Sequence, residues 1–149
     1  MKWIFLPVVI FTALTVVTPI LMSCGSSTSH TINGQWFSSL VNQNQTPDNQ
    51  FRATFMQGMG SSITVSNFSF LSATPCFNTT AETAVLSAQS FQMTITTLFP
   101  GAQNNVLTLN GARQSNGNFS GTWSATGLAG CSGGGTFTMQ PQVPVDPPV

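Results

Sequence analysis

Very few side chains in this chain could carry out acid–base or nucleophilic chemistry. The 149 residues include three acidic side chains, three basic ones and one histidine. A general acid–base pair would need two of Asp48, Glu82 and Asp146, but Asp48 lies in the turn-like NQTPDNQ and Asp146 in a proline-rich tail. His30, the one histidine available to activate a nucleophile, precedes the patterned region. We therefore predict that the chain is not an enzyme and uses no cofactor; catalysis would need an unusual backbone or amide mechanism.

The sequence also lacks the usual signals for metals, phosphates and nucleic acids. Metal sites use paired thiols or closely spaced histidines, which are missing here, so we predict no metal. The glycines of GCSGGG lack the lysine and the following helix of a phosphate-binding loop, and are better read as a loop leading into a strand at TFTMQ. Nucleic-acid binding needs clustered basic residues, and beyond the first residues only Arg52 and Arg113 are basic. These two arginines could orient an anionic ligand head group or be solvated surface charges.

The N-terminus has the pattern of an export signal. Lys2 is followed by an uncharged, mainly apolar run from Trp3 to Met22, which matches the basic and apolar regions of a signal peptide. Pro19 interrupts the end of the run, and no basic cluster follows it. We predict that residues 1–23 are a cleaved signal peptide. An uncleaved anchor is the alternative, because about 20 apolar residues can also span a bilayer.

The residues that end this run, Leu21-Met22-Ser23-Cys24, resemble the lipobox of bacterial lipoproteins. The resemblance implies that Cys24 receives a diacylglyceryl thioether, that cleavage occurs just before it, and that its new amino group is acylated, for example with palmitate. Gly25 follows the cysteine, which by resemblance to the sorting rule of such lipoproteins implies the outer membrane. We therefore expect the lipid bilayer to be a partner through Cys24, with residues 24–31 as a flexible tether.

With Cys24 assigned to lipid, Cys76 and Cys131 remain in a chain that the signal sends to an oxidising compartment. Both lie beside Pro or Gly, in ATPCFN and LAGCSGGG, as expected for loops or strand ends. We predict a disulfide between them. It would close a loop of about 55 residues and stabilise the fold by about 4 kcal/mol.

Residues 32–140 form one predicted domain, followed by a proline-rich tail at residues 141–149. Apolar residues alternate with Ser, Thr, Asn or Gln, for example in FQMTI at 91–95 and LTLN at 107–110. Alternation of this kind predicts strands with one buried and one solvated face. Seven or eight such segments, joined by short turn-rich stretches, predict an all-β fold, either an antiparallel β-barrel or a β-sandwich.

Several local features qualify this pattern. The apolar parity changes between ITV at 63–65 and FSF at 68–70, which predicts a bulge or bend near Ser66-Asn67. The stretches GMGSS, FPGAQNN and QSNGN predict turns, and Asn116-Gly117 is the best hairpin signal. In FRATFMQGM the alternation assigns Ala53, Phe55 and Met59 to one face. TTAETAVL, with capping-box spacing, allows a short helical turn.

The Gly-x-Trp of NGQW, ending at Trp36, resembles the first-strand motif of lipocalins and of small lipocalin-like bacterial lipoproteins. The same triplet recurs at Gly121 to Trp123. The resemblance implies a barrel around an apolar ligand, whereas a domain this small needs its large apolar residues for its own core. The side chains that would either line a pocket or fill the core are Trp36, Phe55, Phe91, Met93, Leu109, Phe119 and Trp123.

We expect the core interpretation to hold, and hence a membrane-anchored, non-catalytic β domain with a structural or protein-interaction role at the cell envelope. The alternative is a lipocalin-like barrel that binds a small apolar molecule. The partner could accordingly be an envelope protein or an apolar ligand, and the sequence does not indicate an oligomeric state.

Overall fold

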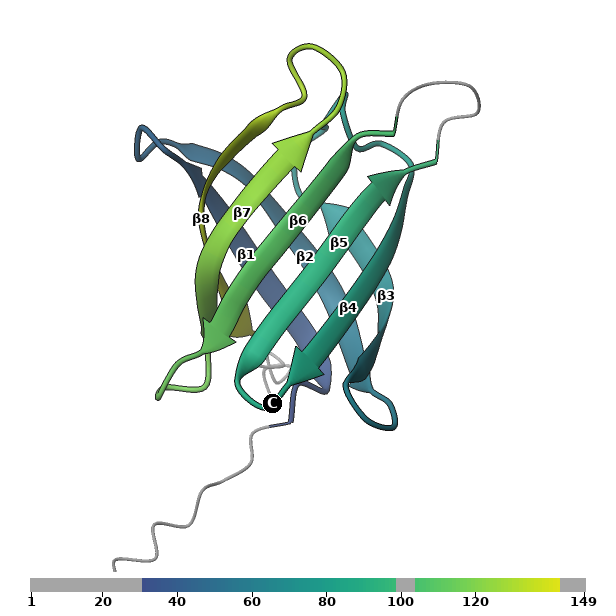
Figure 1. Cartoon of the computed structure of the whole chain (residues 1–149), viewed down its shortest axis with the longest axis vertical. Helices are drawn as coiled ribbons and strands as arrows, with labels where there is room; N and C mark the ends of the chain where they lie inside the picture. The colour runs from purple at the N-terminus through teal and green to yellow at the C-terminus, as the bar shows by residue number, and fades with distance from the viewer. Residues whose placement is uncertain (1–30, 99–103, 143–149) are drawn as a thin grey trace, which may run out of the picture.

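The protein is a closed, antiparallel β-barrel of eight strands. The computed structural model describes residues 31–98 and 104–142. The strands are β1 (Gly34–Asn42), β2 (Pro47–Gln57), β3 (Ser62–Phe70), β4 (Thr80–Ser87), β5 (Ser90–Thr97), β6 (Val106–Arg113), β7 (Phe119–Thr126) and β8 (Gly133–Pro141). Each strand pairs with the next, and β8 pairs back onto β1 (Figure 1). The all-β prediction is confirmed, and the sheet closes into a barrel.

The up-and-down order gives the barrel two distinct ends. The β1–β2, β3–β4, β5–β6 and β7–β8 connections meet at what we call the upper end, which is at the top in Figure 1. The other three connections lie at the lower end, together with the start of β1 and the end of β8. There the Gln142 N–H donates a hydrogen bond to the Gln35 carbonyl at 2.8 Å. Both ends of the described chain therefore leave the barrel on the same side.

Alternating side chains fill the interior. In β5, Phe91, Met93 and Ile95 are 2% exposed or less, while the residues between them face outward or are only partly covered. Aromatic rings meet across the centre, with centroids 5.9 Å apart for Phe55 and Phe91 and 5.2 Å for Phe91 and Phe119. An eight-stranded barrel is just wide enough for side chains to fill. The middle of this barrel is therefore a packed core.

The predicted phase break is a β-bulge in β3. Asn67 has a φ of 50°, and the β2–β3 register shifts between Arg52 and Thr54. β3 and β4 pair only at Ser62 and Ile63, so β3 has already left the β4 ladder before the bulge. The bulge returns Phe68 and Phe70 toward the interior, where both contact the buried ring of Phe51. The bulge prediction near Ser66-Asn67 is confirmed.

One local expectation proves wrong, and a second segment, for which the sequence allowed a helical turn, is a strand. Met59 is 97% exposed, because β2 ends at Gln57 and Met59 sits in the turn instead of extending the buried face. The TTAETAVL segment lies mostly in β4 and forms no helical turn; the hydroxyl of Thr80 donates to the carboxylate of Glu82 along the strand. The Asn116-Gly117 hairpin is confirmed, with Gly117 at a φ of 88°. FPGAQNN falls partly outside the described residues.

Candidate functional site

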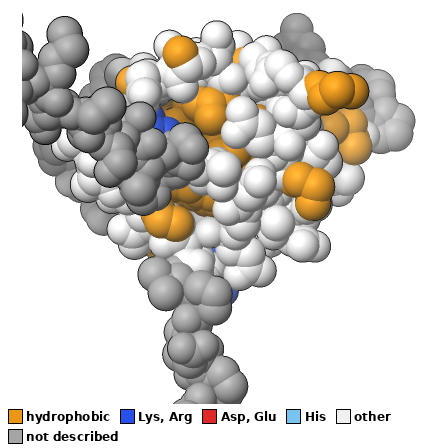
Figure 2. Space-filling model, turned by 90° about the horizontal axis from the view of Figure 1, so that it is seen from below, with side chains coloured by type: hydrophobic (Ala, Val, Ile, Leu, Met, Phe, Trp, Pro, Cys, Tyr) orange, Lys and Arg blue, Asp and Glu red, His pale blue; other side chains and the backbone are white. Residues whose placement is uncertain are grey.

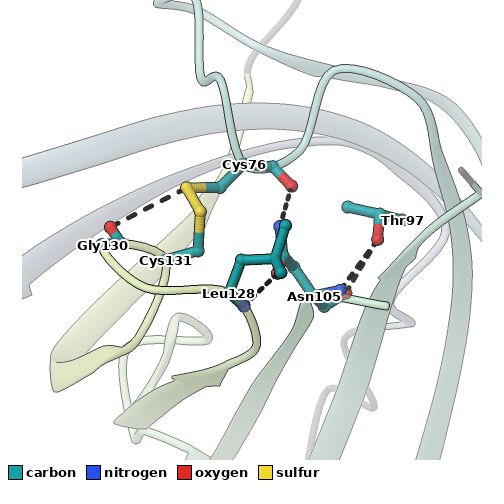
Figure 3. The surroundings of a disulfide bond; sticks show 6 residues. All are labelled: Cys76, Thr97, Asn105, Leu128, Gly130 and Cys131. Carbon is teal, nitrogen blue, oxygen red and sulfur yellow. Dashed lines mark hydrogen bonds between the residues drawn. A yellow bond between two sulfur atoms is a disulfide. The ribbon is translucent and has the colours of Figure 1, made fainter. Parts of the chain in front are cut away.

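A disulfide joins two loops at the upper end, as predicted. Cys76 lies in the β3–β4 connection and Cys131 in the β7–β8 loop (Figure 3). Their Cα atoms are 5.6 Å apart, and the bridge spans a sequence separation of 55 residues. The two loops belong to strands that are not neighbours in the barrel, so the bond fastens one side of the upper end to the other.

A buried asparagine braces the same two loops. Asn105 is 3% exposed and precedes β6. Its Nδ2 donates to the Cys76 carbonyl at 2.9 Å, and its Oδ1 accepts the Leu128 N–H at 2.8 Å (Figure 3). Its backbone N–H donates to the Oγ1 of buried Thr97 at 2.8 Å. Sequence reasoning missed this residue, because its place in FPGAQNN indicated only a turn.

An open cavity of about 1120 Å³ lies at this end of the barrel, and we call it the upper cavity. Its wall includes the disulfide, the half-buried rings of Phe70 and Phe77, and amide side chains of the β1–β2 loop such as Gln43 and Asn44. The rings of Phe70 and Phe77 contact each other with centroids 6.0 Å apart. The cavity therefore offers apolar surface on one side and neutral polar groups on another.

Trp123 forms part of the same wall. Its ring is 6% exposed, and its Nε1–H donates to the Val41 carbonyl at 3.0 Å. Gly133 lies over the ring edge, where an added Cβ would come within 3.3 Å of it. The sequence suggested that the glycines at 133–135 form a loop, but they are the first residues of β8, paired with β7 opposite Trp123. Because these glycines have no side chains, they add no bulk to this part of the cavity wall.

The seven side chains that the sequence identified as lining a pocket or filling the core all belong to the core. Trp36, Phe55, Phe91, Met93, Leu109 and Phe119 are all 3% exposed or less and belong to one packed cluster with Trp123. Of the seven, Trp123 lines the upper cavity. The barrel interior that a lipocalin-like ligand would occupy is thus filled along most of its length.

Trp36 and Arg113 organise the lower end. The Trp36 Nε1–H donates to the carbonyl of buried Ile32 at 2.7 Å, which holds the segment before β1 against the barrel. The Arg113 guanidinium lies 4.7 Å from the centroid of Phe119, a cation–π contact. Partial burial lowers the pKa of Arg113, because removal from water disfavours the charged form. Seen from below, the described surface is mostly uncharged, with scattered apolar side chains (Figure 2).

The two arginines proposed to orient an anionic group do not converge. Arg52 lies on β2 opposite Ser69 of β3, and its side chain is exposed on the outer face of the barrel. Arg113 lies at the lower end. Neither lines the upper cavity. The alternative of solvated charges fits Arg52, whereas Arg113 is packed on an aromatic ring.

The described residues contain few ionisable side chains. Residues 31–98 and 104–142 contain no group of three His, Cys, Asp or Glu side chains that could hold a metal ion. Asp48 borders the upper cavity, and Glu82 is partly buried on β4. Cys24, His30 and Asp146 lie outside the described residues. Within that described part, no helix is long and apolar enough to cross a membrane.

Comparison with known proteins finds no family model, no curated protein and no solved structure that matches this chain.

Proposed function

We propose that this protein is a bacterial envelope lipoprotein, anchored through acylated Cys24, whose non-catalytic barrel has a protein-interaction or structural role. The observation that carries the proposal is the arrangement of the two ends. The chain enters the barrel at the lower end, and the cavity, the disulfide and the hydrogen bonds of Asn105 lie at the upper end. A tether attached near Ile32 would therefore present the upper end away from the membrane.

The length of the proposed tether supports this orientation. Ile32 lies eight positions after Cys24, and a fully extended chain over that separation spans at most about 26–29 Å. The lower end would thus stay close to the lipid surface. Two or three acyl chains would hold it there durably, because a single chain gives only marginal anchorage.

The exposed apolar residues at the upper end favour interaction over a purely structural role. Leu71, Leu98 and Leu128 are 42%, 53% and 47% exposed. Each lies at the upper end, just beyond the strand that precedes the β3–β4, β5–β6 or β7–β8 connection. Single exposed leucines are common on protein surfaces, but three on loops at the same end of the barrel are suited to a partner.

The experiment combines cellular fractionation with intact-mass analysis of the protein extracted from membranes. We expect loss of residues 1–23 and a mass increase that corresponds to a diacylglyceryl group and one further acyl chain. Cys24→Ala should release the protein from the membrane or leave it unprocessed, whereas Ser27→Ala, a matched change in the tether, should behave as the parent. Membrane retention of Cys24→Ala with an intact Met1 would instead establish an uncleaved anchor and refute lipidation.

The second candidate is a barrel that binds a small apolar molecule, as the Gly-x-Trp resemblance implies. Because the interior is filled by side chains, such a ligand would have to use the apolar side of the upper cavity, beside Phe70, Phe77 and Trp123. A saturable rise in melting temperature with lauric acid would favour this candidate, since a ligand that binds only the folded state stabilises it by RT ln(1 + [L]/Kd). We expect no such rise.

A further inference from the structure

The lining of the upper cavity is rich in groups that both donate and accept hydrogen bonds. It includes five amide side chains, three of them Gln43, Asn44 and Asn49, and five hydroxyl side chains, among them Thr74 and Ser124. Among residues 31–98 and 104–142, no lysine, arginine or histidine lines it, and Asp48 is the one acidic residue that does. A site of this kind gives little electrostatic attraction to anions, such as phosphates or fatty acid carboxylates.

Aromatic rings complete the lining. Phe70 and Phe77 are half-buried side by side, and Trp123 closes the wall beneath the glycines of β8. Phe77 directly follows Cys76, so the disulfide fixes the loop that carries it. Rigid aromatic surface next to amides and hydroxyls suits a ligand that has both C–H faces and hydroxyl edges.

One polar atom in the lining lacks a partner among the described residues. The Oγ1 of Thr74 is buried and makes no hydrogen bond within residues 31–98 and 104–142. A buried hydroxyl without a partner is costly, so most such groups in folded proteins are satisfied by protein, water or ligand. Because Thr74 belongs to the lining, a change of its χ1 rotamer would turn this hydroxyl toward the cavity, where a hydroxyl of a bound molecule could supply the missing bond.

We propose that the upper cavity binds an uncharged oligosaccharide. Sugar hydroxyls match the amide and hydroxyl groups, the C–H faces of the sugar rings match Phe70 and Phe77, and the lack of Lys, Arg and His among the described lining residues disfavours anionic ligands. The volume of about 1120 Å³ slightly exceeds the ~300–1,000 Å³ of most small-molecule sites, which leaves room for more than one sugar ring. An extended peptide could pair here only with the upper part of β3, because β1, β7 and β8 are paired on both sides and offer no free edge.

This inference rests on the proposed role as an interaction module and names its ligand class. The test uses the protein extracted from membranes in a zwitterionic detergent, which has no sugar head group. The probes are uncharged hexasaccharides: β-1,4-linked N-acetylglucosamine, α-1,4-linked glucose and β-1,3-linked glucose. Binding is followed by NMR signals of the indole N–H groups and of the backbone amides of Gly133 and Gly134.

We expect at least one hexasaccharide to shift the indole signal of Trp123 and the two glycine amides saturably. The indole signal of Trp36, at the other end of the barrel, should not move and serves as an internal control. Thr74→Val, which removes the hydroxyl while keeping the shape, should weaken binding about two- to tenfold, the effect of one hydrogen bond. Gln43→Ala with Asn44→Ala should weaken it further, whereas Gln89→Ala, an exposed amide at the lower end, should not.

Other outcomes would refute the saccharide site and leave the proposed lipid anchor at Cys24 unaffected. If no hexasaccharide moves the Trp123 signal, or if the shifts survive the Gln43→Ala and Asn44→Ala changes, the cavity is not a saccharide site. Saturation by lauric acid or by an unstructured peptide alone would likewise reject it in favour of that ligand. Failure of the proposed function is separate, because it appears as membrane retention that does not depend on Cys24.

Discussion

Replacement of Asn105 by alanine tests how much this side chain adds to the disulfide in holding the upper end together. The amide joins the β3–β4 connection to the β7–β8 loop through the Cys76 carbonyl and the Leu128 N–H. Alanine would remove both hydrogen bonds and leave two backbone groups without their partner in a region where Asn105 itself is 3% exposed. Its backbone bonds with Thr97 would remain.

The expected loss follows from these contacts. Each lost hydrogen bond costs about 1 kcal/mol net, and each buried group left unpaired adds up to a further ~1–3 kcal/mol unless water reaches it. The cavity alongside admits water, so we take the lower part of the range and expect Asn105→Ala to reduce the free energy of unfolding by about 2–4 kcal/mol. For a domain of this size, that corresponds to a fall in Tm of about 10–20 °C.

The assay is equilibrium urea unfolding monitored by tryptophan emission, with Asn110→Ala as the matched control. Asn110 lies in β6 on the outer face, where its Oδ1 accepts one hydrogen bond from Gln92. Its replacement should cost less than about 0.5 kcal/mol, as expected for a surface change. If Asn105→Ala costs no more than Asn110→Ala, the amide does not brace the loops and the reasoning fails.

Three further changes probe other parts of the fold. Replacement of both Cys76 and Cys131 by serine should reduce the free energy of unfolding by about 4 kcal/mol through the restored loop entropy of the unfolded chain; a change below 1 kcal/mol in urea unfolding would contradict the entropic estimate. Gly121→Ala should prevent folding or reduce the free energy of unfolding by more than about 3 kcal/mol, because a Cβ there would collide with the Asn110 carbonyl of β6. In the control Gly58→Ala, the added Cβ meets only ordinary contacts, so the free energy of unfolding should change by less than about 0.5 kcal/mol. Trp36→Phe should cost about 1–3 kcal/mol by leaving the Ile32 carbonyl without its indole partner, and an unchanged Tm would show that this bond does not hold the segment.

The strands could be predicted from the sequence because their information is local. Alternation of apolar and hydroxyl residues is a property of each segment. It predicted seven or eight strands within residues 32–140, of which the structure has eight, and even the bulge near Asn67. Whether the sheet closes depends on contacts between β1 and β8, about 100 positions apart, which no local pattern encodes. Alternation also does not show where a strand ends. Met59 has the same parity as Phe55 but lies in the turn after β2.

The candidate site was less accessible to prediction. The pairing of Cys76 with Cys131 could be inferred because three cysteines and one resemblance left few choices. Asn105 carries no comparable signal: it is one of many asparagines, and its role depends on two loops that meet only in the folded barrel. For Trp123, alternation predicted correctly that the side chain faces inward. It could not predict that Trp123 lies at the boundary between the packed core and the upper cavity.

The position of the disulfide follows from the uneven pairing of the barrel. The β4–β5 and β6–β7 pairs each align eight positions, whereas β3 and β4 align at Ser62 and Ile63 alone. The upper part of β3 is therefore without ladder bonds on that side, and the chain from Leu71 to Thr79 must be held by other means. Cys76 and Asn105 supply them through one covalent bond and one buried amide. These links fasten the loops at their edges and do not fill the space between them, so the cavity stays open while its lining is held in place. A lining that is already ordered loses less conformational entropy when a ligand binds.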